Sequence, residues 1–212
     1  MKIALIGASG FVGSALLKEA AARGHSVTAI VRNPGKIAEA KGVSVVQADV
    51  TDAAALAALL KGYDIVVSAF NGGWGDPDIY AKHIAGSKAI AAAAKAAGVR
   101  LIEIGGAGSL HAPDGSQLVD SPEFPAAYKD GARAARDALT ALQQGDWKDW
   151  TLVSPAIMLA PGQRTGHYRL GADNPVFDTK GESHISVEDF AVAVLDEAET
   201  PKHSGKRFTV GY

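Results

Sequence analysis

An apolar segment near the start of the chain leads directly into three regularly spaced glycines. Residues 2–6 have the length and apolar character of a buried strand, and Gly7, Gly10 and Gly13 follow at intervals of three. Residues 14–23 then have the composition of a helix. This order predicts a strand, a tight turn and a helix, and it restricts the fold more than any other feature of the sequence.

A glycine-rich turn between a strand and a helix is suited to binding an anion. Glycine takes positive φ without steric strain, and its missing side chain lets a phosphate approach the backbone. The first turn of the helix adds unpaired N–H groups and the positive end of the helix dipole. We therefore predict a dinucleotide-binding turn, while the alternative of a turn that binds nothing stays open. The expected cofactor contacts are Gly7, Ala8, Ser9, Gly10, Phe11, Val12 and Gly13.

The overall composition fits a single domain over residues 1–212. Hydrophobic residues make up 47% of the chain and charged residues 21%, with a net charge of −2, so neither a nucleic-acid partner nor a membrane is expected. The chain has no cysteine, which excludes disulfides, thiolate nucleophiles and cysteine-ligated metals and suits a reducing compartment. We expect a cytoplasmic protein with a small-molecule substrate, and the sequence leaves its oligomeric state open.

Strand-like and helix-like segments alternate regularly after the glycine turn. Runs of apolar and β-branched residues predict four further strands, at 25–31, 43–47, 64–68 and 99–104. Helix signals lie between them, at 34–40, 53–60 and 76–97. Strands and helices alternating at this spacing predict the α/β class, with a Rossmann-like, doubly wound parallel sheet.

The alternation changes beyond residue 105. Stretches rich in Gly, Pro, Asp and Ser now separate the predicted elements, which are helices at 125–144 and 187–199 and strands at 150–154 and 207–210. Two long connections, at 105–125 and about 155–186, follow the carboxyl ends of strands, where open α/β sheets bind ligands. We expect them to form a small, loop-rich C-terminal substrate lobe within the same domain.

Residues after the second predicted strand bear on the choice between NAD and NADP. NAD-preferring proteins place a carboxylate there for the ribose 2′-hydroxyl. This chain has Arg32 and Asn33 instead, with no Asp or Glu between Glu19 and Glu39. A guanidinium can bind a 2′-phosphate through two hydrogen bonds. We predict NADP (NADPH) with Arg32 and Asn33 as ligands; a solvated surface arginine is the alternative.

Further cofactor contacts are expected after the third and fourth strands. Asp49 and Val50 follow the third strand, where a side chain and the backbone could meet the adenine, although Asp49 could also begin the next helix. Ser68, Ala69 and Phe70 end the fourth strand and would run beside the ribose and diphosphate. Phe70 fits a position in the core equally well.

With these motifs in place, the chain resembles the atypical short-chain dehydrogenase/reductases, and within them the small NAD(P)-binding proteins named as NADH-flavin reductases. The resemblance extends over nearly the whole chain and rests further on residues 105–110, 149–151, 154–156, 164–166 and 183–189. It implies a Rossmann fold, a nicotinamide cofactor and hydride transfer to a flavin or quinone. Loops at the strand ends would line the nicotinamide, which adds Gly105, Gly106 and Pro155 to the expected cofactor contacts.

One departure from the family concerns the proton donor. Orthodox short-chain enzymes carry Tyr-x-x-x-Lys on the helix after the fifth strand, whereas here Lys129 directly follows Tyr128 and Ala132 stands four residues on. Adjacent helical residues point in different directions, so Tyr128 and Lys129 cannot reproduce that pair. This disfavours carbonyl reduction and sugar epimerisation. Reduction of a quinone, FMN or FAD fits better, because hydride passes between stacked rings and solvent can supply the proton.

A few polar side chains remain as candidates for chemistry. Ser109 and Tyr128 are the catalytic candidates, because either could hydrogen-bond a substrate carbonyl; a turn serine and a half-buried tyrosine are the alternatives. Arg164 could bind an anionic group such as a flavin phosphate, or it could pair with a carboxylate. The six histidines are scattered without ligand spacing, so no metal site is expected.

Three functions remain open on the sequence alone. The first is an NADPH-dependent reductase of flavin or quinone acceptors. The second is a non-catalytic redox sensor that binds NADP(H), like the nitrogen-metabolite-repression regulators that the fold resembles. The third is a reductase or dehydratase of a small carbonyl metabolite. The sensor predicts cofactor binding without turnover and an exposed apolar patch.

Overall fold

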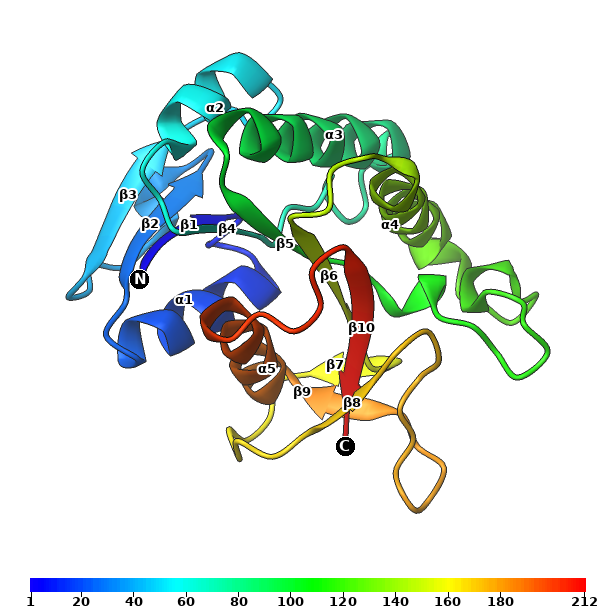
Figure 1. The fold of residues 1–212 in the computed structure, drawn as a ribbon. Coiled ribbons are helices and arrows are strands. Elements are labelled where there is room, and N and C mark those ends of the chain that lie inside the picture. Colours follow the sequence, from blue (N-terminus) through cyan, green and yellow to red (C-terminus); the bar gives the residue numbers. More distant parts are fainter.

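An eight-stranded sheet lies at the centre of the computed structural model, which describes residues 1–212 (Figure 1). Its strand order is β3-β2-β1-β4-β5-β6-β10-β8. All neighbouring strands are parallel except β10 and β8, which are antiparallel at the edge. The strands are β1 (Lys2–Ile6), β2 (Ser26–Val31), β3 (Val43–Gln47), β4 (Ile65–Ser68), β5 (Arg100–Ile104), β6 (Trp150–Pro155), β8 (Arg169–Gly171) and β10 (Lys206–Gly211). The predicted doubly wound, mostly parallel α/β sheet is therefore confirmed.

Five helices cover the two faces of the sheet. Figure 1 shows α1 and α5 on one side and α2, α3 and α4 on the other. Each side encloses its own hydrophobic cluster, and successive strand residues such as Leu101 and Ile102 contribute to opposite clusters. The helices are α1 (Phe11–Ala22), α2 (Ala53–Leu60), α3 (Ile79–Ala97), α4 (Ala126–Gln144) and α5 (Val187–Glu199). Strands buried on both faces explain the nearly continuous apolar runs in the sequence.

Local signals set several helix ends. The side chain of Asp52 accepts a hydrogen bond from the N–H of Ala55 and caps α2, and Ser186 caps α5 through the N–H of Asp189. Gly98, with φ of 67°, ends α3 in the left-handed conformation. These capping residues lie where the sequence pattern begins or ends a helix, so the predicted positions of α2, α3 and α5 are close to those observed.

Two predicted helix boundaries are wrong. Helix α1 begins at Phe11 rather than at residue 14, so the second half of the glycine motif already forms the first helical turn. The helix expected at 34–40 is a single 3₁₀ turn, η1 (Pro34–Lys36), and Ile37 is already extended at φ −102° and ψ 121°. Glycine at the middle position of this turn disfavours a longer helix.

The C-terminal lobe contains more regular structure than its loop-like sequence suggests. Two three-residue strands, β7 (Met158–Ala160) and β9 (His184–Ser186), pair in parallel as a separate small sheet, and β8 joins the edge of the central sheet. The 105–125 connection holds two 3₁₀ turns, η2 (Ala107–Ser109) and η3 (Leu118–Asp120). The N–H of His111 donates to the carbonyl of Asp173 at 2.8 Å, so the two lobe segments lie side by side.

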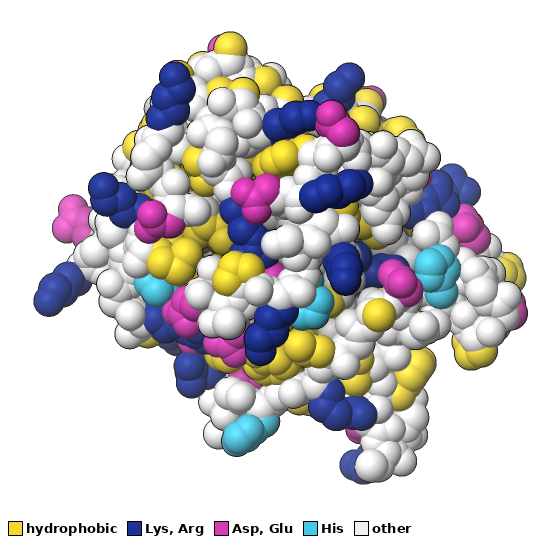
Figure 2. Space-filling view, in the orientation of Figure 1, with side chains coloured by type: hydrophobic (Ala, Val, Ile, Leu, Met, Phe, Trp, Pro, Cys, Tyr) yellow, Lys and Arg dark blue, Asp and Glu magenta, His cyan; other side chains and the backbone are white.

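The molecular surface carries charges of both signs. Figure 2 shows lysine and arginine side chains interspersed with aspartate and glutamate over this face. None of the helices is both long enough and apolar enough to cross a membrane.

Candidate functional site

The glycine turn lies at the point where the order of the sheet reverses. Strand β1 is flanked by β2 and β4, and the chain winds away from it in both directions. A Cβ atom on Gly7 would fall 2.6 Å from the carbonyl oxygen of Ala69, so the loops after β1 and β4 are in direct contact. In open α/β sheets, ligands bind in the crevice at this reversal, outside the carboxyl ends of the strands.

The start of α1 offers free hydrogen-bond donors beside this crevice. Gly10 is the N-cap residue, so no side chain caps the helix, and its first turn contains no acidic residue. The N–H groups of Phe11, Val12 and Gly13 have no acceptor within the protein. A Cβ atom on Gly13 would fall 2.1 Å from the carbonyl oxygen of Gly7. This compact, uncapped and acid-free turn has the donors and the space that a diphosphate requires.

Arg32 stands just past the end of β2 with its guanidinium free. The residue is exposed, and its side chain makes no hydrogen bond or ion pair; only its carbonyl is used, as the acceptor for the Gln47 side-chain amide at 3.0 Å. The side chain of Asn33 accepts the N–H of Gly35 at 3.2 Å and caps η1, which leaves its amide donors unused. A positive group is therefore available where a 2′-phosphate was predicted.

The carboxylate of Asp49 lies near the guanidinium of Arg32 but hydrogen-bonds to Thr51. Its carboxylate accepts the N–H of Thr51 at 2.9 Å and the Thr51 hydroxyl at 2.7 Å. These two bonds hold the pKa of Asp49 below its usual value, with a smaller contribution from the charge of Arg32. Asp49 therefore stays ionised, and its second oxygen remains available to a polar ligand.

The other predicted contacts beside the crevice are mostly turned inward. The side chains of Val50 and Ser68 are buried. The ring of Phe70 packs where a Cβ on Gly86 would fall, 2.2 Å away, and it stacks on His83 with ring centres 5.9 Å apart. Phe70 is partly buried and packs against the core, as its alternative predicted, while its contact with a nucleotide stays a prediction.

Gly105, Gly106 and Pro155 lie at the carboxyl ends of β5 and β6. The N–H of Gly105 donates to Val153 at 2.9 Å and ties the two strand ends together. A Cβ on Gly105 would meet the end of the Leu152 side chain at 2.5 Å, so the two strand ends are closely packed here. The three residues thus border the same edge as the glycine turn.

The two catalytic candidates lie in different surroundings. Ser109 is only 2% exposed; its hydroxyl donates to the Gly106 carbonyl at 3.2 Å and accepts from Arg207 at 3.3 Å. Tyr128 is exposed on the first turn of α4 and meets the Trp74 ring edge to face, with centres 5.5 Å apart. No hydrogen bond joins Tyr128 to Lys129, so a tyrosine–lysine pair is absent. Ser109 fills the role of a turn serine, whereas Tyr128 remains accessible.

Arg164 forms an ion pair rather than an open anion site. Its guanidinium donates to both oxygens of Glu19, at 2.7 and 2.8 Å. Glu19 is buried on α1 and is also bonded to Arg23. The bonds from Arg164, followed by those from Arg23, hold the pKa of Glu19 below its usual value despite burial. The ion-pair alternative for Arg164 is therefore confirmed.

A cavity of about 740 Å³ lies in the C-terminal lobe. Ile157 follows the end of β6 by two residues and Tyr212 follows the end of β10, and both line it. Because β6 and β10 are parallel to β1, the cavity opens at the same edge of the sheet as the glycine turn. Its wall also includes Met158, Ala160, Pro161, Gly162, Gln163, Thr165, Phe177, Gly181, Glu182, Ser183, His184, Ile185 and Ser186. Sequence reasoning placed a substrate lobe here but did not find the cavity.

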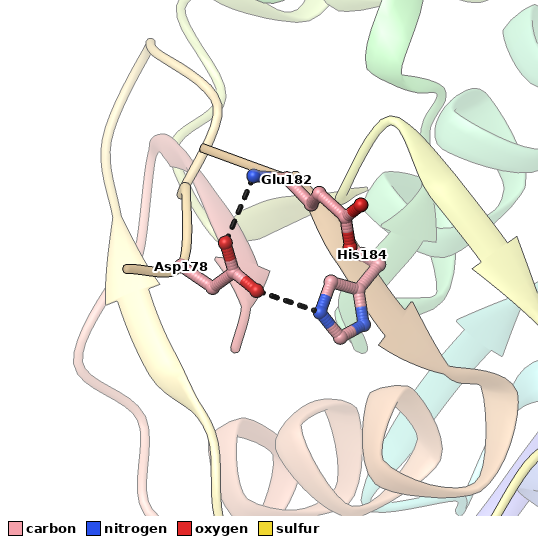
Figure 3. A group of neighbouring side chains, drawn as sticks. All are labelled: Asp178, Glu182 and His184. Atoms are coloured by element: carbon pink, nitrogen blue, oxygen red, sulfur yellow. Dashed lines mark hydrogen bonds and ion pairs between the residues drawn. The ribbon is translucent and has the colours of Figure 1, made fainter. Parts of the chain in front are cut away.

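One wall of the cavity holds an acidic and histidine-containing loop (Figure 3). The carboxylate of Asp178 accepts the N–H groups of Lys180 and Glu182, each at 2.8 Å, and lies 3.4 Å from Nε2 of His184. Possible ligand atoms of Asp178, Glu182 and His184 lie within 4.8 Å of one another, a convergence that the scattered histidines of the sequence did not reveal. The backbone hydrogen bonds account for the position of Asp178 without a metal ion.

Asp189 holds a second group of lining residues in place. Its carboxylate accepts the N–H groups of Thr165 and Gly166 at 2.8 and 2.7 Å and the hydroxyl of Tyr212 at 2.7 Å. Burial favours the neutral form, but these hydrogen bonds outweigh it and hold the pKa of Asp189 below its usual value. The loop at 161–167, the start of α5 and the end of β10 are thereby joined into one rigid wall.

Comparison with known proteins places this geometry in a family. The sequence profile of a family described as NAD(P)H-binding matches residues 7–198. The chain belongs to this NAD(P)H-binding family. The match includes the glycine turn, so a nicotinamide dinucleotide is the cofactor class. The predicted resemblance is thereby confirmed at the level of the family.

Three relatives cover essentially the whole chain. The uncharacterized protein YwnB of Bacillus subtilis is 44% identical over 99% of this chain and 98% of its own length. A solved structure from Bacteroides thetaiotaomicron, named as a candidate epimerase, is 47% identical with a TM-score of 0.91, covering 100% of this chain and 96% of its own. Another from Streptococcus pneumoniae, named as a candidate NADH-flavin reductase, is 35% identical with a TM-score of 0.85, covering 100% and 99%.

Buried polar groups of this NAD(P)H-binding protein gather between β5 and α3, behind the crevice. Glu103 points from β5 into the α3 side of the sheet and is 4% exposed. Burial raises its pKa to about 7, and one carboxyl oxygen has no hydrogen-bond partner. Ser87 and His83 on α3 also have buried polar atoms without partners, and burial lowers the pKa of His83 to about 4. Both ionisable groups therefore favour their neutral forms in the fold.

Proposed function

We propose that the protein is an NADPH-dependent oxidoreductase that passes hydride to a quinone or flavin acceptor. The observation that carries the NADPH preference is the free guanidinium of Arg32 beside an uncapped, acid-free α1. A carboxylate in the place of Arg32 would repel a 2′-phosphate, whereas a guanidinium attracts it.

Different residues of the crevice bind different parts of the cofactor. The turn from Gly7 to Gly13 holds the diphosphate through backbone N–H groups, and Arg32 and Asn33 hold the 2′-phosphate. Asp49 keeps one carboxylate oxygen for the adenosine half. The remaining contacts on this path are Val50, Ser68, Ala69 and Phe70, with Gly105, Gly106 and Pro155 beside the nicotinamide.

The class of hydride acceptor is inferred from the absence of a side chain arranged to protonate a carbonyl substrate. NADPH supplies a hydride; solvent supplies the proton that completes reduction of a quinone to a hydroquinone or of a flavin to its dihydro form. Tyr128 has no lysine partner and Ser109 is engaged within the fold, so neither is set up to protonate a carbonyl substrate. Protein residues then orient the rings and exclude water. The name of the Streptococcus pneumoniae relative supports this acceptor class.

A non-catalytic NADP(H) sensor is the second candidate. Ile157, Met158 and Phe177 are large apolar side chains that are half exposed around the lobe cavity, as a sensor with a partner-binding patch would require. Reduction of a small carbonyl compound is the third candidate, and it is disfavoured because Tyr128 has no lysine partner. For each candidate we propose a cytoplasmic location, because NADPH is maintained there as a reductant.

A panel of acceptors tests the proposal. NADPH oxidation is measured with FMN, FAD, menadione and small aldehydes, with NADH in parallel. We expect turnover with a flavin or quinone and a preference for NADPH. Tight NADPH binding without turnover on any acceptor would favour the sensor, and turnover on aldehydes alone would refute the acceptor assignment.

A further inference from the structure

We propose that the lobe cavity binds an uncharged quinone-like ring and disfavours acceptors that carry a phosphate or sulfonate. The inference rests on the proposed reductase function and narrows its acceptor class. It is carried by the position, the apolar wall and the charge of the cavity.

The position of the cavity suits the second substrate of a nicotinamide enzyme. It is built on residues that follow β6 and β10, at the edge where the glycine turn binds the cofactor. Strand β6 lies three strand spacings from β1, about 14 Å at ~4.8 Å per strand. The cavity therefore borders the nicotinamide end of the crevice and lies away from the turn that holds the diphosphate.

The wall of the cavity is suited to a flat apolar ring. Ile157 and Met158 lie on one side of it, and Phe177 reaches it from the loop before β9. These large apolar side chains are 46% to 63% exposed. An aromatic ring and a flexible thioether around a concave site are typical of small-molecule binding. The Gln163 side-chain amide makes no hydrogen bond within the protein and can donate one to a quinone carbonyl.

Charge around the cavity disfavours an anion. Glu182 and His184 are its only lining residues with ionisable acidic or basic groups besides the phenol of Tyr212, and no lysine or arginine lines it. The carboxylates of Asp178 and Glu188 are close behind: Asp178 contacts His184, and Glu188 accepts the N–H of Gly162 at 2.9 Å.

Two arginines beside the cavity are already engaged. The guanidinium of Arg169 donates to the carbonyl oxygens of Phe177 and Tyr212, both of which line the cavity, but it does not line the cavity itself. On the other side, Arg164 is bound to Glu19. Lys180 is exposed on the loop before Gly181 but does not line the cavity. A phosphate or sulfonate in the cavity would thus meet the carboxylate of Glu182 and no lining lysine or arginine that could compensate its desolvation.

Pairs of acceptors that share a ring but differ in charge test whether the cavity disfavours anions. Menadione and 1,4-naphthoquinone-2-sulfonate share a ring but differ in charge, as do riboflavin and FMN. Their binding to the NADP⁺-saturated protein is measured by equilibrium dialysis, which does not depend on turnover. We expect each neutral compound to bind at least tenfold more tightly than its anionic partner. Equal or tighter binding of the anions would overturn the proposal.

Two substitutions locate the binding. Phe177→Ala should weaken menadione binding at least fivefold, whereas Leu170→Ala, a side chain of similar exposure (48% against 47%) in the same lobe but outside the cavity, should leave it unchanged. Glu182→Gln should strengthen binding of the sulfonate about threefold without affecting menadione. If Phe177→Ala has no effect, the ring binds elsewhere and the proposal is wrong.

The outcomes separate this inference from the function on which it rests. Binding of menadione that depends on Phe177, without NADPH oxidation, would retain the cavity and refute the reductase. NADPH oxidation that is faster with FMN than with riboflavin would support the reductase function and refute the proposal that the cavity disfavours anionic acceptors.

Discussion

Replacement of Glu103 by glutamine should stabilise the protein, increasingly so as the pH rises from about 4.5 to about 7. Glu103 is 4% exposed, and burial raises its pKa from 4.5 to about 7. The native state therefore holds a proton on this group that the unfolded chain releases above pH 4.5. Stability contributed by the neutral form is present at low pH and falls as the pH rises through about 7.

The magnitude follows from the size of the shift. The change in pKa from 4.5 to about 7 corresponds to about 3 kcal/mol when the group is fully ionised, and about 2–3 kcal/mol of this develops between pH 5 and pH 8. Glutamine preserves the shape of the side chain and stays neutral. Any change in hydrogen bonding caused by the new amide acts at both pH values and cancels in the comparison.

Urea unfolding at pH 5 and pH 8 measures this effect. The free energy of unfolding of Glu103→Gln, relative to the unsubstituted protein, should be about 2–3 kcal/mol more favourable at pH 8 than at pH 5. Glu123→Gln, at an exposed position whose side chain makes no hydrogen bond, serves as the control and should show no such difference. A relative stability of Glu103→Gln that is the same at both pH values would refute the reasoning.

Two further substitutions test the crevice and the ion pair beside it. Gly7→Ala should destabilise the fold by about 2 kcal/mol more than Gly24→Ala. Both glycines have positive φ, but only at Gly7 would the new Cβ clash with backbone, 2.6 Å from the carbonyl oxygen of Ala69. Equal losses of stability in thermal unfolding would contradict this. Arg164→Ala should lower stability by less than about 1 kcal/mol because its side chain is 55% exposed. Arg23→Ala removes a more buried partner of Glu19, Asp196 and Glu199 and should lower stability by about 2–3 kcal/mol. A larger loss of stability in Arg164→Ala than in Arg23→Ala, measured by urea unfolding, would refute this reasoning.

Much of the first half of the fold could be predicted because its signals are local. The glycine turn, the apolar strands and Gly98 as a helix stop each depend on residues close together in the sequence. Rossmann-like winding follows from their alternation. The crevice between β1 and β4 is therefore accessible to sequence reasoning.

The C-terminal lobe could not be predicted because it depends on contacts between distant residues. Strands β7, β8 and β9 have three residues each, too few for an apolar pattern to stand out. The hydroxyl of Ser109 accepts a hydrogen bond from Arg207, which reaches it from β10 at the end of the chain. Glu103 similarly gave no signal, since a single charged residue in a strand does not reveal that helix α3 covers it.

Calorimetric titration with NADP⁺ and NAD⁺ tests the central claim most directly. The unsubstituted protein should bind NADP⁺ more tightly than NAD⁺, and Arg32→Ala should weaken NADP⁺ binding by about 1–3 kcal/mol while leaving NAD⁺ nearly unchanged. Lys41→Ala removes the same charge from an exposed position before the amino end of β3, at the opposite end of the strands from Arg32, and should have little effect on either. Equal losses for the two dinucleotides in Arg32→Ala, or no NADP⁺ binding by the folded protein, would contradict the account.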